Sequence, residues 1–311
     1  MSSSNYRPKP ALAFGSWALL LSVVFLSALG AAASAASFEL PALNSPPSTE
    51  HHVGKVVWAD LVTPDLAAAE RFYGGLFSWT FQTIHTGDSE YAVASADGRA
   101  VGGLFQKSIP AGEHRQSAWL TFIAVRDVDA AKRAALMHGA KVVADSRTYP
   151  ARGRQAVLSD PDGAVFAVVA SSSGDTGDFL AAPGEWIWSS LLAKHPADEA
   201  GFYQEVFSYD VFDLASEDGL DHMILSSDDY ARASVNAFPG GGARRHPHWL
   251  NFVRVDSTAN ATARAVALGG RVLVEPHVDR HGGMVAVVAD PAGAPVGLME
   301  WTGADSKVEP K

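Results

Sequence analysis

The sequence predicts an α+β protein of four β-α-β-β-β units arranged as two tandem pairs, and two observations support this class. A short pattern, Trp-x-polar-Leu/Phe, occurs four times, beginning at Trp58, Trp119, Trp188 and Trp249. The first and third copies lie 130 residues apart, as do the second and fourth, and other landmarks keep that offset: Phe72-Tyr73 with Phe202-Tyr203, Gly139 with Gly269, and Asp160-Pro161 with Asp290-Pro291. A constant offset indicates duplication of a complete unit.

The first unit begins with an alternating segment at 54–62, which is typical of a strand. Thr63 or Asp65 then caps a helix whose apolar residues recur at helical spacing up to Leu76. Three short strands are expected at about 79–85, 90–96 and 100–105. Asp97-Gly98 between the last two predicts a tight hairpin turn.

The same order of elements repeats along the chain. In the second unit a strand at 118–125 precedes a helix at 128–138, which Gly139 ends, and strands follow near 154–159 and 164–170. The second pair begins with a strand at 185–192, a helix at 196–206 and three strands to about 236. Its last unit has a strand at 248–255, a helix at 257–268 and strands at 270–275, 283–289 and 294–300.

The residues before the first unit predict an export signal. Arg7 and Lys9 precede an apolar run, and the small residues at 33–36 resemble a cleavage site, so residues 1–36 are interpreted as a signal peptide cut near Ala35. An uncleaved membrane anchor is the alternative, because about 20 apolar residues span a bilayer. Localisation is therefore periplasmic or extracellular, or membrane-anchored. The remaining boundaries are a flexible tether at 37–53, domains at 54–172 and 184–302, a linker at 173–183 and a tail at 303–311.

Composition excludes several classes of partner and chemistry. The net charge of −10 argues against nucleic acid, which requires a clustered basic surface. The chain has no cysteine, so disulfides, thiolate nucleophiles and zinc-thiolate sites are excluded. The expected partner is a small molecule, with a membrane only if the leader stays attached, and homo-oligomerisation is left open.

The repeated units resemble the vicinal oxygen chelate superfamily, which includes glyoxalases, bleomycin-resistance proteins and extradiol dioxygenases. The resemblance covers about 54–302 and depends on Phe-Tyr late in the first helix of each pair and Asp-Pro-x-Gly before the last strand. It implies two tandem glyoxalase/bleomycin-resistance-like domains, each a cupped mixed sheet. The segment 69–79 also resembles the FYxxLFGW segment of the glyoxalase-like branch, with Ser78 in place of the usual glycine.

That resemblance also implies where metal ligands would lie, and this chain departs from the pattern there. The first-strand positions are the four tryptophans, and the last-strand glutamate positions are Ala167 and Gly297. Divalent metals in such enzymes need about three nitrogen or oxygen ligands. The sequence therefore predicts no metal at the usual site and no cofactor. A non-standard set in the second domain is the alternative, made of His222, His246, His248, His277, His281 and Glu300.

Alternation along each strand places every tryptophan on the same face as the polar residue two positions later. The pairs are Trp58 with Asp60, Trp119 with Thr121, Trp188 with Ser190, and Trp249 with Asn251. We expect two such pairs to converge in each cup, where they would bind a flat, partly polar organic ligand. The alternative is that the indoles fill the cups as core.

Asp60 is the one candidate catalytic residue, because a carboxylate lining an open pocket can act as a general base. A basic loop at Arg244-Arg245 could attract an anionic ligand, and a solvated loop is the simpler interpretation. Three functions remain: an exported, metal-independent binding protein, a lyase or dioxygenase with displaced metal ligands, or a structural module with filled cups.

Overall fold

The computed structural model describes residues 39–86, 89–107, 117–214, 221–238, 246–279 and 282–301. The first pair of units has the predicted β-α-β-β-β order twice. Its first unit consists of β1 (Val56–Thr63), α2 (Leu66–Phe77), β2 (Thr80–Thr86), β3 (Ser89–Ala96) and β4 (Arg99–Gln106). Its second unit consists of β5 (Ala118–Ala124), α3 (Val128–Met137), β6 (Lys141–Tyr149), β7 (Gly153–Ser159) and β8 (Val165–Ser171).

The second pair repeats this order. Its first unit contains β9 (Trp186–Ala193), α4 (Pro196–Phe207), β10 (Asp210–Asp213), β11 (His222–Ser227) and β12 (Tyr230–Ala237). Its second unit contains β13 (His248–Arg254), α5 (Thr258–Ala267), β14 (Arg271–Val278), β15 (Met284–Ala289) and β16 (Pro295–Met299). The predicted α+β class and the two tandem domains are therefore confirmed.

Each pair of units forms one eight-stranded mixed sheet. The strand orders are β2-β3-β4-β1-β5-β8-β7-β6 and β10-β11-β12-β9-β13-β16-β15-β14. In the first sheet, β1 and β5 pair antiparallel at the centre, and each is parallel to the last strand of its own unit. The two units of a domain are thus joined through their first strands.

Local signals explain where the helices begin and end. Asp65, Asp127 and Ser257 lie before α2, α3 and α5, and each side chain accepts a backbone N–H of the first turn. Helix α4 follows His195 and instead has Pro196 in its first turn. At the hairpin between β3 and β4, Asp97 and Gly98 have φ of 46° and 79°, as the primed turn requires.

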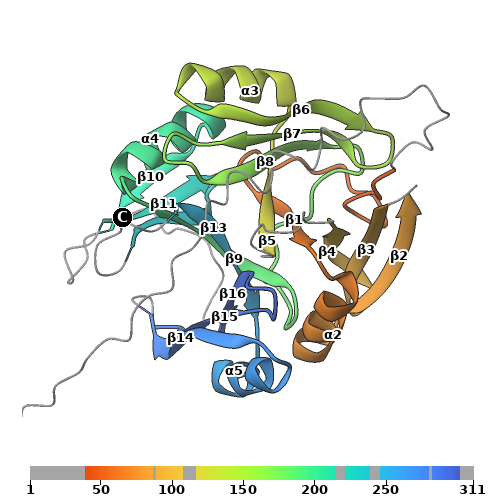
Figure 1. Cartoon of the computed structure of the whole chain (residues 1–311). Helices are drawn as coiled ribbons and strands as arrows, with labels where there is room; N and C mark the ends of the chain where they lie inside the picture. The colour runs from red at the N-terminus through yellow and green to blue at the C-terminus, as the bar shows by residue number, and fades with distance from the viewer. Residues whose placement is uncertain are drawn as a thin grey trace, which may run out of the picture.

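The helices pair across the two domains, and the hydrophobic cores join units of different domains. Figure 1 shows α3 beside α4 at one end of the molecule and α2 near α5 at the other, where these pairs contact. One hydrophobic core combines β1, α2 and β3 with α5, β15 and β16, and the other combines units two and three. The pairing of strands therefore stays within a domain, whereas the hydrophobic packing joins the two domains.

The interpreted signal peptide falls at residues 1–36, outside the described part of the chain. Within the described part, no helix has the length and apolar composition needed to cross a bilayer.

Candidate functional site

The strand register separates the tryptophans that we expected to converge. Trp58 lies opposite Phe122 in the β1–β5 pair, whereas Trp119 lies opposite Leu61. Directly opposed residues share a face, so Trp58 and Asp60 face away from the helices, while Trp119 and Thr121 face them. Each sheet therefore has a helix-free face with one predicted Trp-polar pair. The expectation of two pairs on one face is wrong.

The reason is a difference of one residue in spacing. Trp58 and Trp119 are 61 residues apart, but the helix caps Asp65 and Asp127 that follow them are 62 apart. The structural counterpart of Trp58 is therefore Leu120. A shift of one residue moves every side chain of a strand to the other face.

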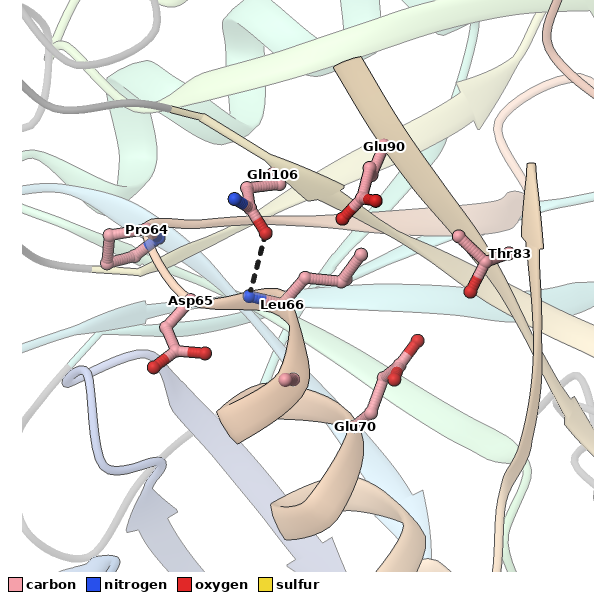
Figure 2. Close-up of a pocket in the computed structure, with 8 residues that line it drawn as sticks. Pro64, Asp65, Leu66, Glu70, Thr83, Glu90 and Gln106 are labelled. Atoms are coloured by element: carbon pink, nitrogen blue, oxygen red, sulfur yellow. Dashed lines mark hydrogen bonds between the residues drawn. The ribbon is translucent and has the colours of Figure 1, made fainter. Parts of the chain in front are cut away.

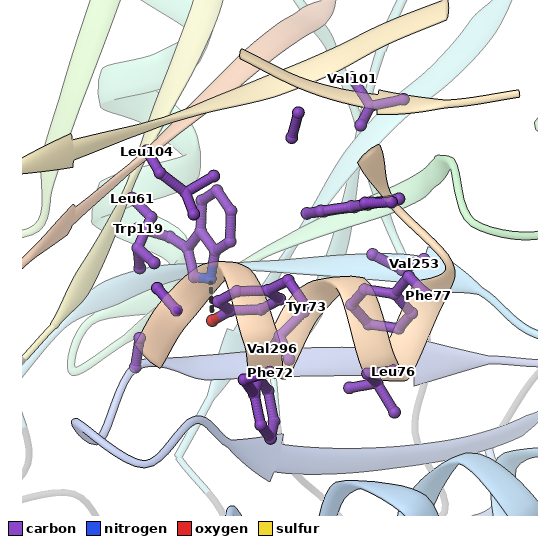
Figure 3. Packing of buried hydrophobic residues seen from close by; sticks show 14 of the residues in the cluster. Leu61, Phe72, Tyr73, Leu76, Phe77, Val101, Leu104, Trp119, Val253 and Val296 are labelled. Carbon is purple, nitrogen blue, oxygen red and sulfur yellow. Dashed lines mark hydrogen bonds between the residues drawn. The ribbon is translucent and has the colours of Figure 1, made fainter. Parts of the chain in front are cut away.

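Trp119 and Trp249 belong to the hydrophobic layer between the sheets. Trp119 Nε1 donates to the Tyr73 hydroxyl at 3.0 Å (Figure 3), and Trp249 Nε1 donates to the Tyr203 hydroxyl at 2.9 Å. Tyr73 in turn donates to Asp290, and Tyr203 to Asp160. The landmarks Phe-Tyr and Asp-Pro-x-Gly thus meet across the domain boundary, where burial raises the pKa of both aspartates to about 6.

Thr121 and Asn251 also lie in this layer, at its polar centre. Asn251 Nδ2 donates to Thr121 Oγ1 at 3.0 Å, and Ser189 Oγ donates to Asn251 Oδ1 at 2.8 Å. All three side chains are buried. Of the predicted binding residues, Trp119, Thr121, Trp249 and Asn251 thus lie between the domains, which leaves Trp58, Asp60, Trp188 and Ser190 on the helix-free faces.

On the first helix-free face, Asp60 is held in a buried network with Arg152. Asp60 Oδ1 accepts from Trp58 Nε1 and from Tyr91, both at 2.7 Å, and Oδ2 accepts from Arg152 Nη1 at 3.3 Å. Arg152 is fully buried, and its guanidinium lies 5.0 Å from the centre of the Trp58 ring. Asp60 is a partnered carboxylate here and does not line an open pocket.

Residues 39–50, which we call the strap, cover this face. Leu43 packs into the cluster around Trp58, and Leu40 packs against Tyr91 and Tyr149. The Pro41 carbonyl accepts from Arg152 Nε at 3.0 Å. The expectation of a flexible tether at 37–53 therefore does not describe residues 39–53, because Leu40 and Leu43 are buried.

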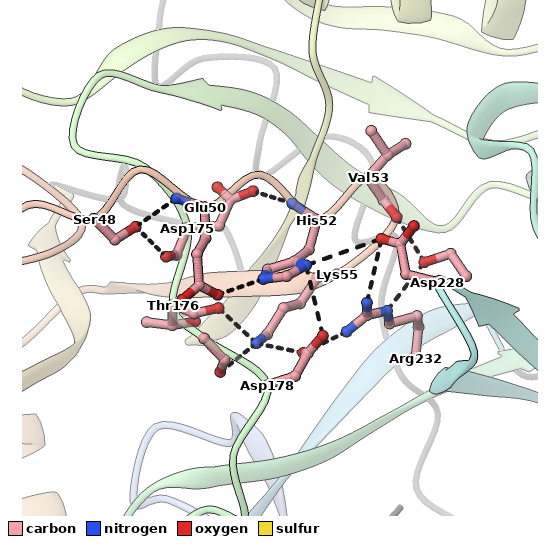
Figure 4. A network of polar contacts seen from close by, with 12 residues as sticks. Ser48, Glu50, His52, Val53, Lys55, Asp175, Thr176, Asp178, Asp228 and Arg232 are labelled. Carbon is pink, nitrogen blue, oxygen red and sulfur yellow. Dashed lines mark hydrogen bonds and ion pairs between the residues drawn. The ribbon is translucent and has the colours of Figure 1, made fainter. Parts of the chain in front are cut away.

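Polar contacts attach the strap and the start of β1 to the interdomain linker. The Asn44 amide and side chain bond to Ser173 and Gly174, and Lys55 Nζ donates to Asp178 at 2.8 Å. Asp178 also accepts from Arg232 of the second domain (Figure 4). This network connects the strap, linker and second sheet.

The second helix-free face has different residues at the equivalent positions. The register that places Asp60 beside Gly103 places Ser190 beside Ser234, and the position of Tyr91 is taken by His222. The counterpart of Arg152, at the offset of 130, is the exposed Gly282. At these two described positions, Ser190 and Gly282, the second face therefore has neither the carboxylate nor the guanidinium of the first.

Neutral polar groups form a connected set on this face. Ser234 Oγ accepts hydrogen bonds from Trp188 Nε1 at 3.1 Å and from Asn236 Nδ2 at 2.9 Å. It also lies 2.8 Å from Ser190 Oγ. His222 Nδ1 bonds to Asn236 Oδ1. Ser234 and Asn236 are not among the binding residues predicted from the sequence. Side chains alternate along a strand, so the two-residue spacing of Ser234 and Asn236 could have indicated that they share a face.

Apolar side chains surround this polar set and are more exposed than their counterparts. Val274 pairs with Val287 on the helix-free face and is 41% exposed, whereas its counterpart Ala144 is 4% exposed. Trp188 is half-buried, whereas Trp58 is 1% exposed. The second face is thus an accessible surface with an indole, hydroxyls and an apolar surround.

The positions that the resemblance assigns to metal ligands do not fit a metal. A side chain at Gly297 would begin 2.2 Å from the Phe252 ring. Ala167 is buried in the cluster around Trp58. No group of three or more His, Asp or Glu side chains that could hold a metal occurs among the described residues.

The alternative histidine set is also dispersed, as far as it is described. Glu300 accepts from the backbone and hydroxyl of Thr258 at the start of α5, and His277 is exposed on β14. His248 Nδ1 bonds to the His246 carbonyl. His281 lies outside the described residues, as do Arg244 and Arg245.

Two surface hollows lie elsewhere on the molecule. One, of about 370 Å³, is acidic and lies at the start of α2, with Asp65, Glu70 and Glu90 in its lining (Figure 2). The other, of about 520 Å³, lies between the domains and is lined by Phe77, Arg254 and Arg264 among others. Neither contains a sequence-predicted binding residue.

Two eight-stranded sheets, each built from two β-α-β-β-β units, define a two-domain protein of the vicinal oxygen chelate superfamily. A family model described as a glyoxalase-like domain matches residues 56–169 and 189–299. The chain therefore belongs to the glyoxalase-like domain family.

Relatives cover most of the chain. DauV of Streptomyces sp. (strain C5), named an anthracycline biosynthesis protein, is 30% identical over 259 residues, which are 79% of this chain and 93% of DauV. CFP32 of Mycobacterium tuberculosis, which carries the name of a glyoxylase, is 29% identical over 251 residues, 80% of this chain and 95% of CFP32.

Solved structures show the same fold at low identity. A Mn(II)-bound glyoxalase from Novosphingobium aromaticivorans has a TM-score of 0.56 and 17% identity, covering 80% of this chain and 82% of its own. The 2,3-dioxygenase LapB from Pseudomonas sp. KL28 has a TM-score of 0.59 and 13% identity, and the match covers 84% of this chain and 96% of LapB.

Proposed function

We propose that this is an exported protein that binds a flat, mainly apolar organic molecule on the helix-free face of its second domain, without a metal ion. One contrast supports this choice of face. The first face is covered by the strap and has a buried ion pair, whereas Trp188 and Val274 on the second are accessible beside neutral hydroxyls. Indole stacking with a few hydrogen bonds suits an aromatic ligand.

The name of one relative supports the same class of ligand. DauV is named an anthracycline biosynthesis protein, and anthracyclines contain a flat, fused aromatic ring system. Sequestration or carriage is the function that needs only the surface described. Fold similarity to a glyoxalase and to dioxygenases does not supply a reaction, because one fold supports many chemistries.

Calorimetric titration of the mature protein with an anthracycline and with 2-acetylnaphthalene tests this proposal. We expect saturable binding, weakened about tenfold in Trp188→Ala because stacking is lost. Phe179→Ala, at an exposed aromatic residue of the linker, is the matched control and leaves affinity unchanged. Chelator treatment also leaves affinity unchanged if no metal takes part. Binding that survives Trp188→Ala, or disappears with chelator, contradicts the proposal.

Export is tested separately, by mass measurement of the protein recovered outside the cytoplasm. A mature N-terminus near Ala36 supports it, and that cut would keep Leu40 and Leu43 in place over the first face. A protein that retains its leader in the cytoplasm contradicts it.

A further inference from the structure

The hydrogen bonds on the second helix-free face have a direction, which begins at His222. Asn236 Nδ2 donates to Ser234 Oγ, so the amide oxygen of Asn236 is the atom turned toward His222. An amide oxygen only accepts, and therefore His222 Nδ1 carries the proton in this pair. The first two bonds thus donate from His222 to Asn236 and from Asn236 to Ser234.

Ser234 passes this direction on to Ser190. A hydroxyl oxygen has two lone pairs and one hydrogen. The Ser234 oxygen accepts from Asn236 Nδ2 and from Trp188 Nε1, which occupies both lone pairs. Its hydrogen is left for the one remaining neighbour, Ser190 Oγ at 2.8 Å. Ser190 is therefore the acceptor in the Ser190–Ser234 bond.

The hydroxyl hydrogen of Ser190 then remains, and the described residues offer no acceptor for it. The serine is 6% exposed, on the face that also carries Trp188. A buried donor without an acceptor costs free energy, and a bound molecule could remove that cost. The equivalent position on the first face is Asp60, whose carboxylate only accepts and already receives hydrogen bonds from Trp58, Tyr91 and Arg152.

We propose that Ser190 donates a hydrogen bond to a carbonyl oxygen of the ligand, so that the second domain selects aryl ketones or quinones over hydrocarbons of the same shape. This inference rests on the proposed function, and it adds which polar group the ligand must carry. Ser190 is the specificity-determining residue, and Trp188, Ser234 and Asn236 orient it.

A pair of probes of nearly equal shape tests this selection. The ketone 2-acetylnaphthalene and the hydrocarbon 2-isopropenylnaphthalene share a trigonal carbon on the ring and differ in the replacement of the carbonyl oxygen by a CH2 group. We expect Ser190→Ala to weaken binding of the ketone about three- to tenfold, the range for one neutral hydrogen bond, and to leave binding of the hydrocarbon unchanged. Ser172→Ala, at a serine of the first domain, is the matched control and changes neither affinity.

A second measurement does not depend on affinity. The carbonyl stretching band of bound 2-acetylnaphthalene should lie at lower frequency in the wild-type protein than in Ser190→Ala, because a donated hydrogen bond weakens the C=O bond. Equal bands, or equal losses for both probes, overturn the role of Ser190 while binding itself stands. Failure of both probes to bind the wild-type protein overturns the proposed function together with this inference.

Discussion

At the scale of single residues, Glu199 is a buried acid that the binding face does not use. It is 2% exposed at the start of α4, and one of its oxygens accepts the Asp162 amide at 3.0 Å. Burial first, and then the neighbouring Asp160 carboxylate, raise the pKa of Glu199 to about 9. The counterpart of Glu199 in the first domain is Ala69. A second carboxyl group therefore lies beside Asp160 at the Tyr203 contact, whereas Asp290 at the Tyr73 contact has no such neighbour at the equivalent position.

Glu199→Gln should therefore make the protein less sensitive to alkaline pH. The folded state holds the proton more tightly than the unfolded state, so wild-type stability is full below about pH 4.5 and falls as pH rises toward 9. Glutamine keeps an amide beside Asp160 and cannot ionise. Between pH 6 and pH 8 we expect the wild type to lose on the order of 2 kcal/mol relative to the variant, measured by urea unfolding.

Parallel stability curves for the two proteins would contradict this assignment. The Glu205→Gln variant provides the control, because Glu205 lies on the same helix with its side chain 61% exposed. Its stability should follow that of the wild type at each pH.

At the scale of elements, the positions of strands and helices could be predicted, but their faces and the strap could not. Caps such as Asp65 and turns such as Asp97-Gly98 are local signals, and the structure has them where the sequence indicates. The face of Trp119 depends on its spacing to the helix cap Asp127, which is one residue longer than the spacing from Trp58 to Asp65, so matching the tryptophans by their shared pattern gave the wrong register. The strap has a fixed position because Leu40 packs against Tyr91 and Tyr149, which are distant from it in the sequence.

The strap should contribute to stability as a core element does. Leu43 is 2% exposed, so Leu43→Ala is expected to destabilise the protein by about 2–4 kcal/mol through lost burial and the cavity left behind. Leu180→Ala is the matched control, because Leu180 of the linker is 46% exposed and its loss should cost less than about 0.5 kcal/mol. Equal effects of the two changes on the denaturant midpoint would show that the strap is not part of the fold.

At the scale of the whole molecule, the two domains share both hydrophobic cores. Tyr73 of the first domain reaches Asp290 of the second, and Tyr203 of the second reaches Asp160 of the first. Helices α2 and α5 bury apolar residues in one core, with Phe72 and Ala265 among them. A domain separated from its partner would expose half of each core, although its sheet would retain all its strand pairing.

Calorimetry should therefore show one unfolding transition for the intact chain, with equal calorimetric and van't Hoff enthalpies. The segments 39–172 and 184–301, expressed alone, should aggregate or remain unfolded, because each lacks the partner surfaces of both cores. Expressed together they should form a one-to-one complex, since the contacts between them are non-covalent. Two resolved transitions, or a soluble and cooperatively folded single domain, would mean that the sheets are stable without the shared cores.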